Sequence, residues 1–353
     1  MKKKFKLNIW LAFAFIILLN SCNEKENMKV QNYYSAGAIS SSVISYTPYK
    51  VKIRLRFFIY DKTNNDGTAR IDPNGRISYS GVYMGTYDSL KRVITDVNGN
   101  FSAAVIISSG KDIQINMRDF FEILEPTTRK ICHSSLPANE ILLVQAGNKS
   151  EPVKFIGGGF TRNPYTLDQD IAAICKTGNY VATDSLCLLK AIDSVFNYMI
   201  SNSSYTNRNC IIMVSRREYF WNDLNTTAIT NKAIQNGIRC HLIDICPAYT
   251  WENTTIYKFL SKLNARTNGI YYSSPFSYIY YFEDSELPMD MLQLAANVPS
   301  IFYGGAECFE MIWTIESSSA KFFTGNVYED EFMLRLNTNS EQDEIRVNFR
   351  FYI

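Results

Sequence analysis

The residues best suited to chemistry in this 353-residue chain are its cysteines and its two histidines. They meet in two neighbour pairs, Cys132-His133 and Cys240-His241, and thiolate and imidazole side chains serve both as zinc ligands and as nucleophile–base pairs. Neither pair is accompanied by further Cys or His residues at the spacing of a zinc site. The sequence pattern also marks no nucleophile together with a positioned base. Seven of the eight cysteines lie beyond Cys22, so at least one is free or bonded between chains. Because most lie in apolar segments, we interpret them as buried thiols and predict neither a zinc site nor a thiol active site.

A glycine triplet at Gly157–Gly159 raises the question of a phosphate-binding loop. Such a loop opens directly onto a helix whose N-terminus faces the phosphate. The residues that follow, Phe160 to Pro164, show no helix start in the sequence pattern. We therefore interpret the triplet as the end of a strand.

The N-terminus has the order of an export signal. Four lysines within the first six residues precede an uncharged apolar run, Ile9 to Leu19. This run is well short of the roughly 20 residues that a membrane-spanning helix needs. Leu19-Asn20-Ser21-Cys22 then resembles the lipobox of bacterial lipoproteins, in which the cysteine is acylated and becomes the new N-terminus. We expect a signal peptide over residues 1–21 and a lipid on Cys22; the alternative is an ordinary signal peptide with a chance cysteine.

Charge excludes one class of partner. Removal of residues 1–21 takes away four of the 36 basic side chains and none of the 34 acidic ones, which leaves 32 against 34. Nucleic-acid binding needs a basic surface, so we predict no nucleic-acid partner. The expected location is the outer membrane or cell surface, with a periplasm-facing position as the alternative, and the membrane is contacted through the lipid on Cys22.

Both ends of the remaining chain have the period of β-strands. Apolar and charged residues alternate over 50–60 and again over 344–353, and turn residues separate short Tyr- and Val-rich runs between 65 and 99. We predict that the regions 48–101 and 281–353 pack together as an antiparallel β-sandwich. Residues 22–47 lack a periodic apolar pattern and are interpreted as a flexible tether.

The middle of the chain alternates apolar runs with helical patterns, which favours a parallel sheet with crossover helices. Strands are predicted near 103–107, 141–144, 153–156, 210–214, 238–245 and 269–272, and helices near 113–124, 184–200, 230–235 and 256–263. The fold class is thus α/β, a doubly wound and mostly parallel sheet over 102–280, inserted in or flanked by the sandwich. The alternative is another doubly wound domain, such as a solute-binding lobe.

Three stretches of this middle region carry a family resemblance: Asn209–Ser215, Lys232–Asp244 and Tyr257–Tyr271. In order they give a strand, a helix that ends in a glycine turn before a Gly-Ile-Arg strand, and a helix that leads to a Gly-Ile-Tyr-Tyr strand. The pattern resembles the second half of a von Willebrand factor A (integrin I-like) domain, here in a bacterial, Bacteroidetes-like lipoprotein.

The resemblance implies a place for a metal site and also shows what occupies it. Family members hold a divalent cation with Asp-x-Ser-x-Ser after the first strand, a threonine before the central helix, and an aspartate after the fourth strand. The resemblance places Ile107 at the first aspartate, Ser109 and Lys111 at the two serines, Thr183 nearest the threonine, and Arg216 at the last aspartate. Cationic side chains repel a divalent cation, so we predict no metal and no other cofactor.

What remains is a candidate partner-binding loop apex. Its members are Ser109, Lys111, Thr183, Arg216 and Arg217. Either the cations recognise an anionic group directly, or Arg216 is neutralised internally by Asp184 or Asp112. We predict a non-enzymatic binding or adhesion module for a protein or glycan partner; the alternative is an envelope enzyme, hydrolase-like, with a site that the pattern does not mark.

Overall fold

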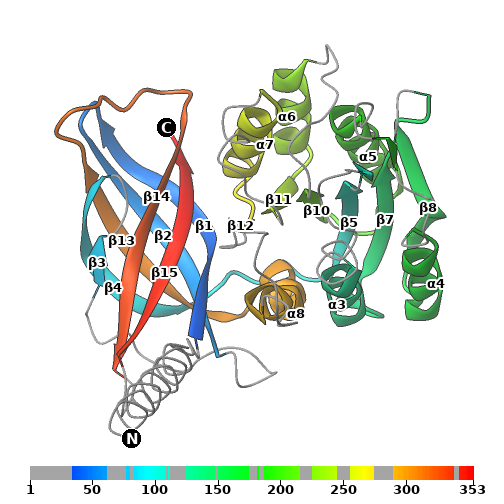
Figure 1. The fold of residues 1–353 in the computed structure, drawn as a ribbon, viewed down its shortest axis with the longest axis horizontal. Coiled ribbons are helices and arrows are strands. Elements are labelled where there is room, and N and C mark those ends of the chain that lie inside the picture. The colour runs from blue at the N-terminus through cyan, green and yellow to red at the C-terminus, as the bar shows by residue number, and fades with distance from the viewer. Residues whose placement is uncertain are drawn as a thin grey trace, which may run out of the picture. The chain divides into compact units, whose positions relative to one another are not determined.

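A computed structural model describes residues 34–353 apart from 62–76, 80–82, 109, 112–124, 148–149, 175–180, 183–186, 215–224, 245–254, 274–288 and 338–341. Tyr34–Ile353 form one compact unit of the chain. This unit combines an antiparallel β-sandwich with a mostly parallel sheet that carries helices on both faces (Figure 1). The predicted fold class is confirmed.

The sandwich consists of a four-stranded and a three-stranded antiparallel sheet. The first has the order β1 (Tyr34–Thr47), β2 (Lys50–Asp61), β13 (Glu307–Glu316), β4 (Met84–Ile94), and the second the order β15 (Gln342–Tyr352), β14 (Val327–Asn337), β3 (Ile77–Tyr79). The alternation in β2 and β15 turns apolar side chains inward. Val51, Ile53, Phe349 and Phe351 are all buried in one core.

The second sheet has six strands. Its order is β12 (Tyr271–Ser273), β11 (Ile238–Asp244), β10 (Asn207–Val214), β5 (Phe101–Ser108), β7 (Glu140–Ala146), β8 (Val153–Thr161). All neighbours are parallel except the edge strand β8, which runs antiparallel to β7. Every residue of β5 and β7 is buried, as continuous apolar runs covered on both faces should be.

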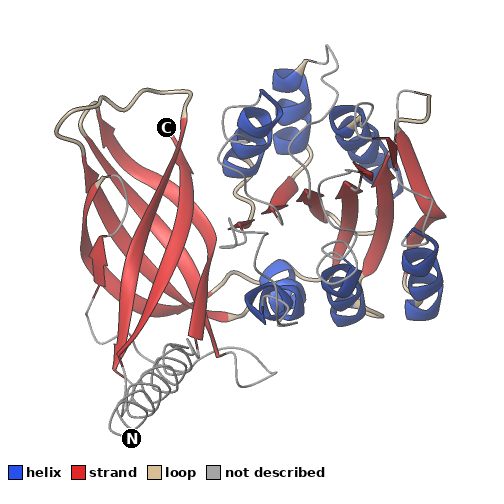
Figure 2. Ribbon diagram, in the orientation of Figure 1, coloured by secondary structure: helices blue, strands red, loops and turns tan. Residues whose placement is uncertain are grey.

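Helices cover both faces of this sheet (Figure 2). One face packs against α3 (Glu125–Ser135), α4 (Pro164–Ile174) and α8 (Met289–Tyr303), and the other against α5 (Leu188–Asn202), α6 (Thr226–Gln235) and α7 (Thr255–Arg266). Within the described part of the chain, no helix is long and apolar enough to cross a membrane.

The structure corrects three sequence interpretations. Residues 34–47 are not part of a tether but form β1, whose serine-rich sequence hid its strand character. The region 281–353 is not wholly β, because it contains α8. The glycine triplet lies inside β8 rather than at its end, and α4 begins five residues after it. The helix predicted at 113–124 lies outside the described residues.

Two chain segments join the sandwich to the α/β sheet, and they run side by side (Figure 1). Residues 95–100 lead from β4 to β5, and residues 304–306 lead from α8 back to β13. The amide of Thr95 donates to Ala306 and that of Gly305 to Thr95, while Asn98 donates to Tyr303. Gly304 has φ +85°, and a β-carbon there would lie 1.8 Å from the carbonyl oxygen of Asp96, so this close approach requires glycine. We call this double connection the neck.

Candidate functional site

The carboxyl ends of four parallel strands form one level edge of the α/β sheet. The register pairs Ser108 of β5 with Val214 of β10, Val214 with Asp244 of β11, and Asp244 with Ser273 of β12. The strand order reverses between β5 and β10, since β7 and β8 continue to one side and β11 and β12 to the other. In open α/β sheets, ligands bind outside the carboxyl ends of the strands at this point of reversal. This carboxyl edge is therefore the candidate site.

A small extra strand pair brings two of the predicted loops together at this edge. β6 (Gly110–Lys111) follows β5 and pairs in parallel with β9 (Val181–Ala182), so that the backbone of Lys111 lies opposite Ala182. Thr183 is the next residue after Ala182. Ser109, Thr183, Arg216, Arg217 and Cys22 themselves lie outside the described residues, so their proposed roles stay predictions.

The described part of this edge does not fit a divalent-metal site. Ile107, which the resemblance places at the first aspartate, has 1 % of its surface exposed and packs among the apolar side chains between the sheet and α3. It offers no oxygen, and Mg²⁺ or Mn²⁺ needs several hard oxygen ligands. No three His, Cys, Asp or Glu side chains gather in a ligand-like group among the residues that the structure describes.

His241 is a structural residue rather than a catalytic base. The amide of Ile270 donates to its Nδ1 at 2.9 Å, which makes Nε2 the protonated nitrogen, and Nε2 donates to Oδ1 of Asn209 at 3.1 Å. Burial, and then the charge of Arg239, hold the pKa of His241 well below its usual value. A fully buried neutral imidazole with both nitrogens engaged has no free nitrogen with which to take a proton from a substrate.

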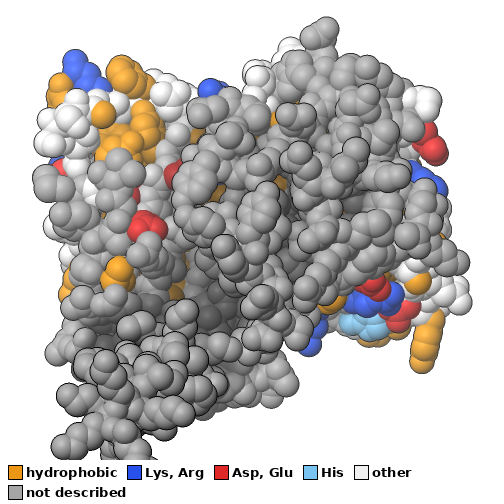
Figure 3. All heavy atoms as spheres, in the orientation of Figure 1, with side chains coloured by type: hydrophobic (Ala, Val, Ile, Leu, Met, Phe, Trp, Pro, Cys, Tyr) orange, Lys and Arg blue, Asp and Glu red, His pale blue; other side chains and the backbone are white. Residues whose placement is uncertain are grey.

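The other histidine lies on the surface in a charged cluster. Nε2 of His133 is 2.8 Å from Oδ1 of Asp168, and Nη1 of Arg129 is 2.5 Å from the same oxygen. Figure 3 shows exposed histidine atoms, in pale blue, among Lys, Arg, Asp and Glu side chains on the face in view. Its sequence neighbour Cys132 points the opposite way, into the core, where burial raises the pKa of its thiol to about 12. The pair is therefore not a nucleophile with its base.

The five cysteines of the described part, Cys132, Cys187, Cys210, Cys240 and Cys308, are all buried, and no disulfide joins any two of them. Cys210 and Cys240 face each other across β10 and β11, and burial raises the pKa of both. Raised thiol pKa values and burial both disfavour thiol chemistry here.

Sequence reasoning missed one polar centre, around Arg350 of β15. Its side chain has 2 % exposure; Nε lies 2.6 Å from Oε1 of Glu329, and an Nη donates to the hydroxyl of Tyr257. That hydroxyl lies 3.2 Å from the same carboxylate oxygen, and the guanidinium stacks over the ring of Tyr271 at 3.2 Å from its centroid. The alternation placed Arg350 on the outer face of its strand, but no sequence signal showed that α7 and β12 cover that face.

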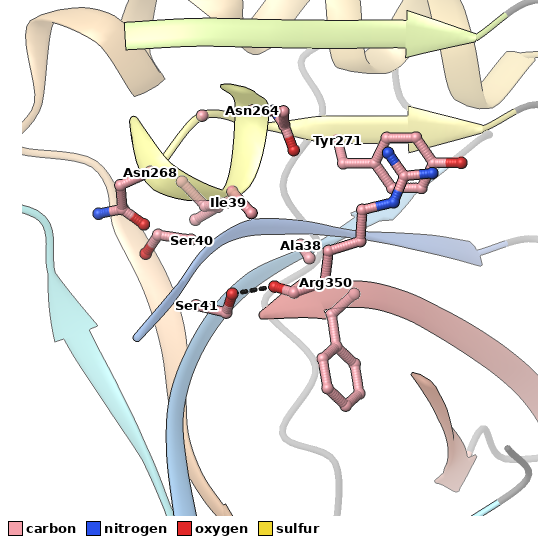
Figure 4. Close-up of a pocket in the computed structure, with 11 residues that line it drawn as sticks. Ala38, Ile39, Ser40, Ser41, Asn264, Asn268, Tyr271 and Arg350 are labelled. Carbon is pink, nitrogen blue, oxygen red and sulfur yellow. Dashed lines mark hydrogen bonds between the residues drawn. The ribbon is translucent and has the colours of Figure 1, made fainter. Parts of the chain in front are cut away.

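A small cavity adjoins this centre (Figure 4). It is lined by residues of β1, the C-terminal end of α7, β12 and β15, among them Ser40, Asn268 and Tyr271. The Ser41 hydroxyl donates to the carbonyl oxygen of Arg350, which holds β1 beside β15. The centre joins the sandwich to the α/β sheet, and we interpret it as a structural contact.

No protein-family model and no curated protein sequence matches this chain. Among solved structures, a von Willebrand factor type A protein from Catenulispora acidiphila is similar with 9% identity and a TM-score of 0.42, over 92% of this chain and 76% of that chain. The manganese-loaded TRAP protein of Plasmodium vivax is similar with 11% identity and a TM-score of 0.38, over 76% of this chain and 98% of that chain. The pilus adhesin SpaC of Lactobacillus rhamnosus GG is similar with 7% identity and a TM-score of 0.38, over 90% of this chain and 47% of that chain.

These scores do not by themselves establish family membership. The sheet itself defines the class: a doubly wound α/β domain with one antiparallel edge strand, whose two chain connections lead into an antiparallel sandwich.

Proposed function

We propose that this chain is a cell-envelope lipoprotein, held by a lipid on Cys22, that binds a protein or glycan partner without a metal and without catalysis. The observation that carries the proposal is the carboxyl edge. The strand order reverses there, and the β6–β9 pair draws the segment after β5 towards the segment before α5. The proposed contacts are made by Lys111, Arg216 and Arg217, with Ser109 and Thr183 beside them.

One described feature favours binding without a metal, and a second disfavours catalysis by a histidine. The strand end that would carry the first metal ligand is closed by Ile107, and cationic side chains follow it in sequence. Both histidines have assigned roles away from the edge: His241 is buried among Asn209, Ile270 and Phe302, and His133 pairs with Asp168 on α4. A planar guanidinium such as that of Arg216 can take a carboxylate in two parallel hydrogen bonds, which suits an acidic peptide or an acidic sugar.

The test uses the full lipidated chain in nanodiscs, applied to an array of immobilised glycans and matrix proteins. We expect binding to at least one acidic component, unchanged by EDTA and weakened by salt, because exposed charges act over about 8 Å at physiological ionic strength. The double variant Lys111→Ala with Arg216→Ala should lose this binding. Lys130→Ala, which removes an exposed lysine of α3, is the matched control and should keep it.

Three results would contradict the proposal. They are binding that EDTA abolishes, binding that the double variant keeps in full, and an array on which the native chain binds nothing. The envelope-enzyme alternative would gain support if the native chain released a product from a bound component and the double variant did not.

A further inference from the structure

The neck and the residues that flank it, Ile94 at the end of β4 and Tyr303 at the end of α8, carry three large apolar side chains that face solvent. Ile94 is 69 % exposed, Val97 68 % and Tyr303 44 %. Their backbones lie close together, because Asn98, next to Val97, donates to the carbonyl oxygen of Tyr303, and Ile94 precedes the Thr95–Ala306 bond. Isolated exposed apolar residues are ordinary, but three close together on one rigid connection offer contacts to an apolar partner.

The neck surface is held in shape by the backbone. Besides the Thr95–Ala306 and Gly305–Thr95 bonds, the hydroxyl of Thr95 accepts from the amide of Ala306 at 3.0 Å. The α8 end is fixed as well, since the carbonyl oxygen of Phe302 accepts from Asn207 at 2.9 Å and from Arg239 at 3.2 Å. A preformed apolar surface docks without a large ordering cost.

The register of the sandwich places the neck at the end where the N-terminal segment enters. Tyr34 pairs with Asp61 and Ala36 with Ile59, two residues along. Phe309 pairs with Phe57, so Glu307 lies level with Ile59, and Glu307 pairs with Ile94. Ile94 is thus level with the third residue of β1, and the β1–β2 turn lies at the opposite end of the sandwich.

The length of chain before β1 decides which end reaches a membrane that holds Cys22. The twelve residues from Cys22 to Tyr34 span at most about 42 Å when fully extended. β1 has 14 residues and is about 46 Å long. A lipid on Cys22 therefore keeps the neck end within reach of the bilayer, whereas the far end of β1 lies beyond what the segment can span along the strand.

We propose that Ile94, Val97 and Tyr303 insert into the surface of the bilayer that carries the lipid of Cys22, so that the neck is a second, non-covalent membrane contact. The inference rests on the proposed lipid anchor. The side chain of Tyr303 has an apolar ring and a polar hydroxyl, and tyrosine is enriched at the boundary between headgroups and acyl chains. A lipid on Cys22 leaves the domain free to turn on its tether, and a second contact would fix the orientation of the domain on the membrane.

The contact is apolar rather than electrostatic. The charged side chains at and beside the neck form two opposite-charge pairs, Arg56 with Asp96 at 3.9 Å and Arg92 with Glu307 at 3.4 Å. The two pairs balance, so anionic lipid gains no net attraction. Insertion should therefore occur as readily in uncharged vesicles of phosphatidylethanolamine with phosphatidylcholine as in vesicles that contain anionic lipid. It should also be insensitive to salt.

The experiment places a tryptophan at the neck of the full lipidated chain, reconstituted in such vesicles with or without brominated acyl chains. Brominated lipid should remove roughly half of the added emission of Val97→Trp and of Ile94→Trp, as for a ring within about 10 Å of the headgroup boundary. Phe323→Trp is the matched control, an exposed aromatic position in the β13–β14 loop at the far end of the sandwich. Its added emission should not change.

Vesicle flotation separates the two proposals. If the chain does not float with vesicles, or if Cys22→Ala floats as well as the native chain, the lipid anchor fails. If the native chain floats and bromine quenches the neck tryptophans no more than Phe323→Trp, the anchor stands and the neck contact is overturned. A blue shift without quenching that grows with protein density would assign the surface to a second copy of the chain, which also overturns the inference.

Discussion

Replacing Arg350 by methionine tests the contact between the sandwich and the α/β sheet. Methionine keeps most of the apolar stem that packs on β15 but removes the charge, the hydrogen bond to Tyr257 and the ion pair with Glu329. The change also removes the stacking of the guanidinium on Tyr271. We expect the variant to fold and to be less stable.

The magnitude follows from the burial of each partner. Breaking a fully buried ion pair costs about 3–5 kcal/mol because it strands the remaining charge. Glu329 is 42 % exposed and stays solvated, so the ion-pair part is discounted to about 1 kcal/mol. Loss of a largely desolvated cation–π contact adds about 1–2 kcal/mol. The sum, about 2–3 kcal/mol, corresponds to a fall in Tm of about 3–5 °C for a chain of this size.

Thermal unfolding followed by circular dichroism measures this fall in Tm on the chain prepared without its lipid. Lys50→Met is the matched control: it also removes a cation from a sandwich strand and breaks an ion pair, but both partners, Lys50 and Glu316, are more than half exposed. Its Tm should equal that of the native chain. Equal Tm values for Arg350→Met and Lys50→Met would refute the assignment of Arg350 as a stabilising contact.

The free energy of unfolding should fall as pH drops below about 6.5, by up to about 1.4 kcal/mol per pH unit. The reason is that the unfolded chain protonates His241, whereas the lowered pKa of His241 keeps the imidazole of the folded chain neutral. In urea titrations between pH 6.5 and 5.5, His241→Gln should flatten this slope. Asn268 has φ +55° after α7, so Asn268→Gly should leave stability unchanged or raise it, whereas Asn268→Val should lower the urea midpoint. Gly269→Ala should prevent folding, since its β-carbon would lie 1.9 Å from the carbonyl oxygen of Cys240; a soluble variant with native circular dichroism would show this geometry to be wrong. Cys22→Ala should move the chain from the membrane to the soluble fraction after a high-salt wash, and retention of the variant would count against the lipid anchor.

The fold class could be predicted because period and burial agree along most strands. The run at Cys210–Val214 is apolar throughout and forms the buried part of β10, and the alternation from Val51 to Phe57 forms the inner face of β2. β1 escaped prediction because its serines reduce the apolar contrast between its two faces. α4 escaped because Pro164 looks like a break, although Asn163 caps the helix by accepting from Tyr165 at 3.0 Å.

The candidate site could be predicted only as a location. Parallel strands bring their carboxyl ends to one edge, so loops after 107 and 214 had to be neighbours once the strand order was correct. The burial of Ile107 agrees with its apolar type, but the contact between Arg350 and Tyr271 depends on how two sheets far apart in sequence meet. No local pattern encodes that contact.

The neck joins the sandwich to one edge of the α/β sheet and, among the described residues, leaves the opposite edge without a chain crossing. β5 starts one residue after the neck and runs away from it, and α8 returns to the neck, so both chain crossings lie at the amino ends of the parallel strands. That end is fixed by buried polar bonds: the carboxylate of Glu140 accepts from Ser102 at 2.6 Å and from the amide of Ser204 at 2.6 Å. In the described part of the chain, no segment leads directly from the carboxyl edge to a sandwich strand. If the neck rests on the bilayer, the carboxyl edge of the sheet faces away from the membrane, whereas a tethered chain without neck contact would present that edge in all directions. Cross-linking of Lys111 to lipid headgroups in vesicles would therefore contradict both the orientation and the binding role of this edge.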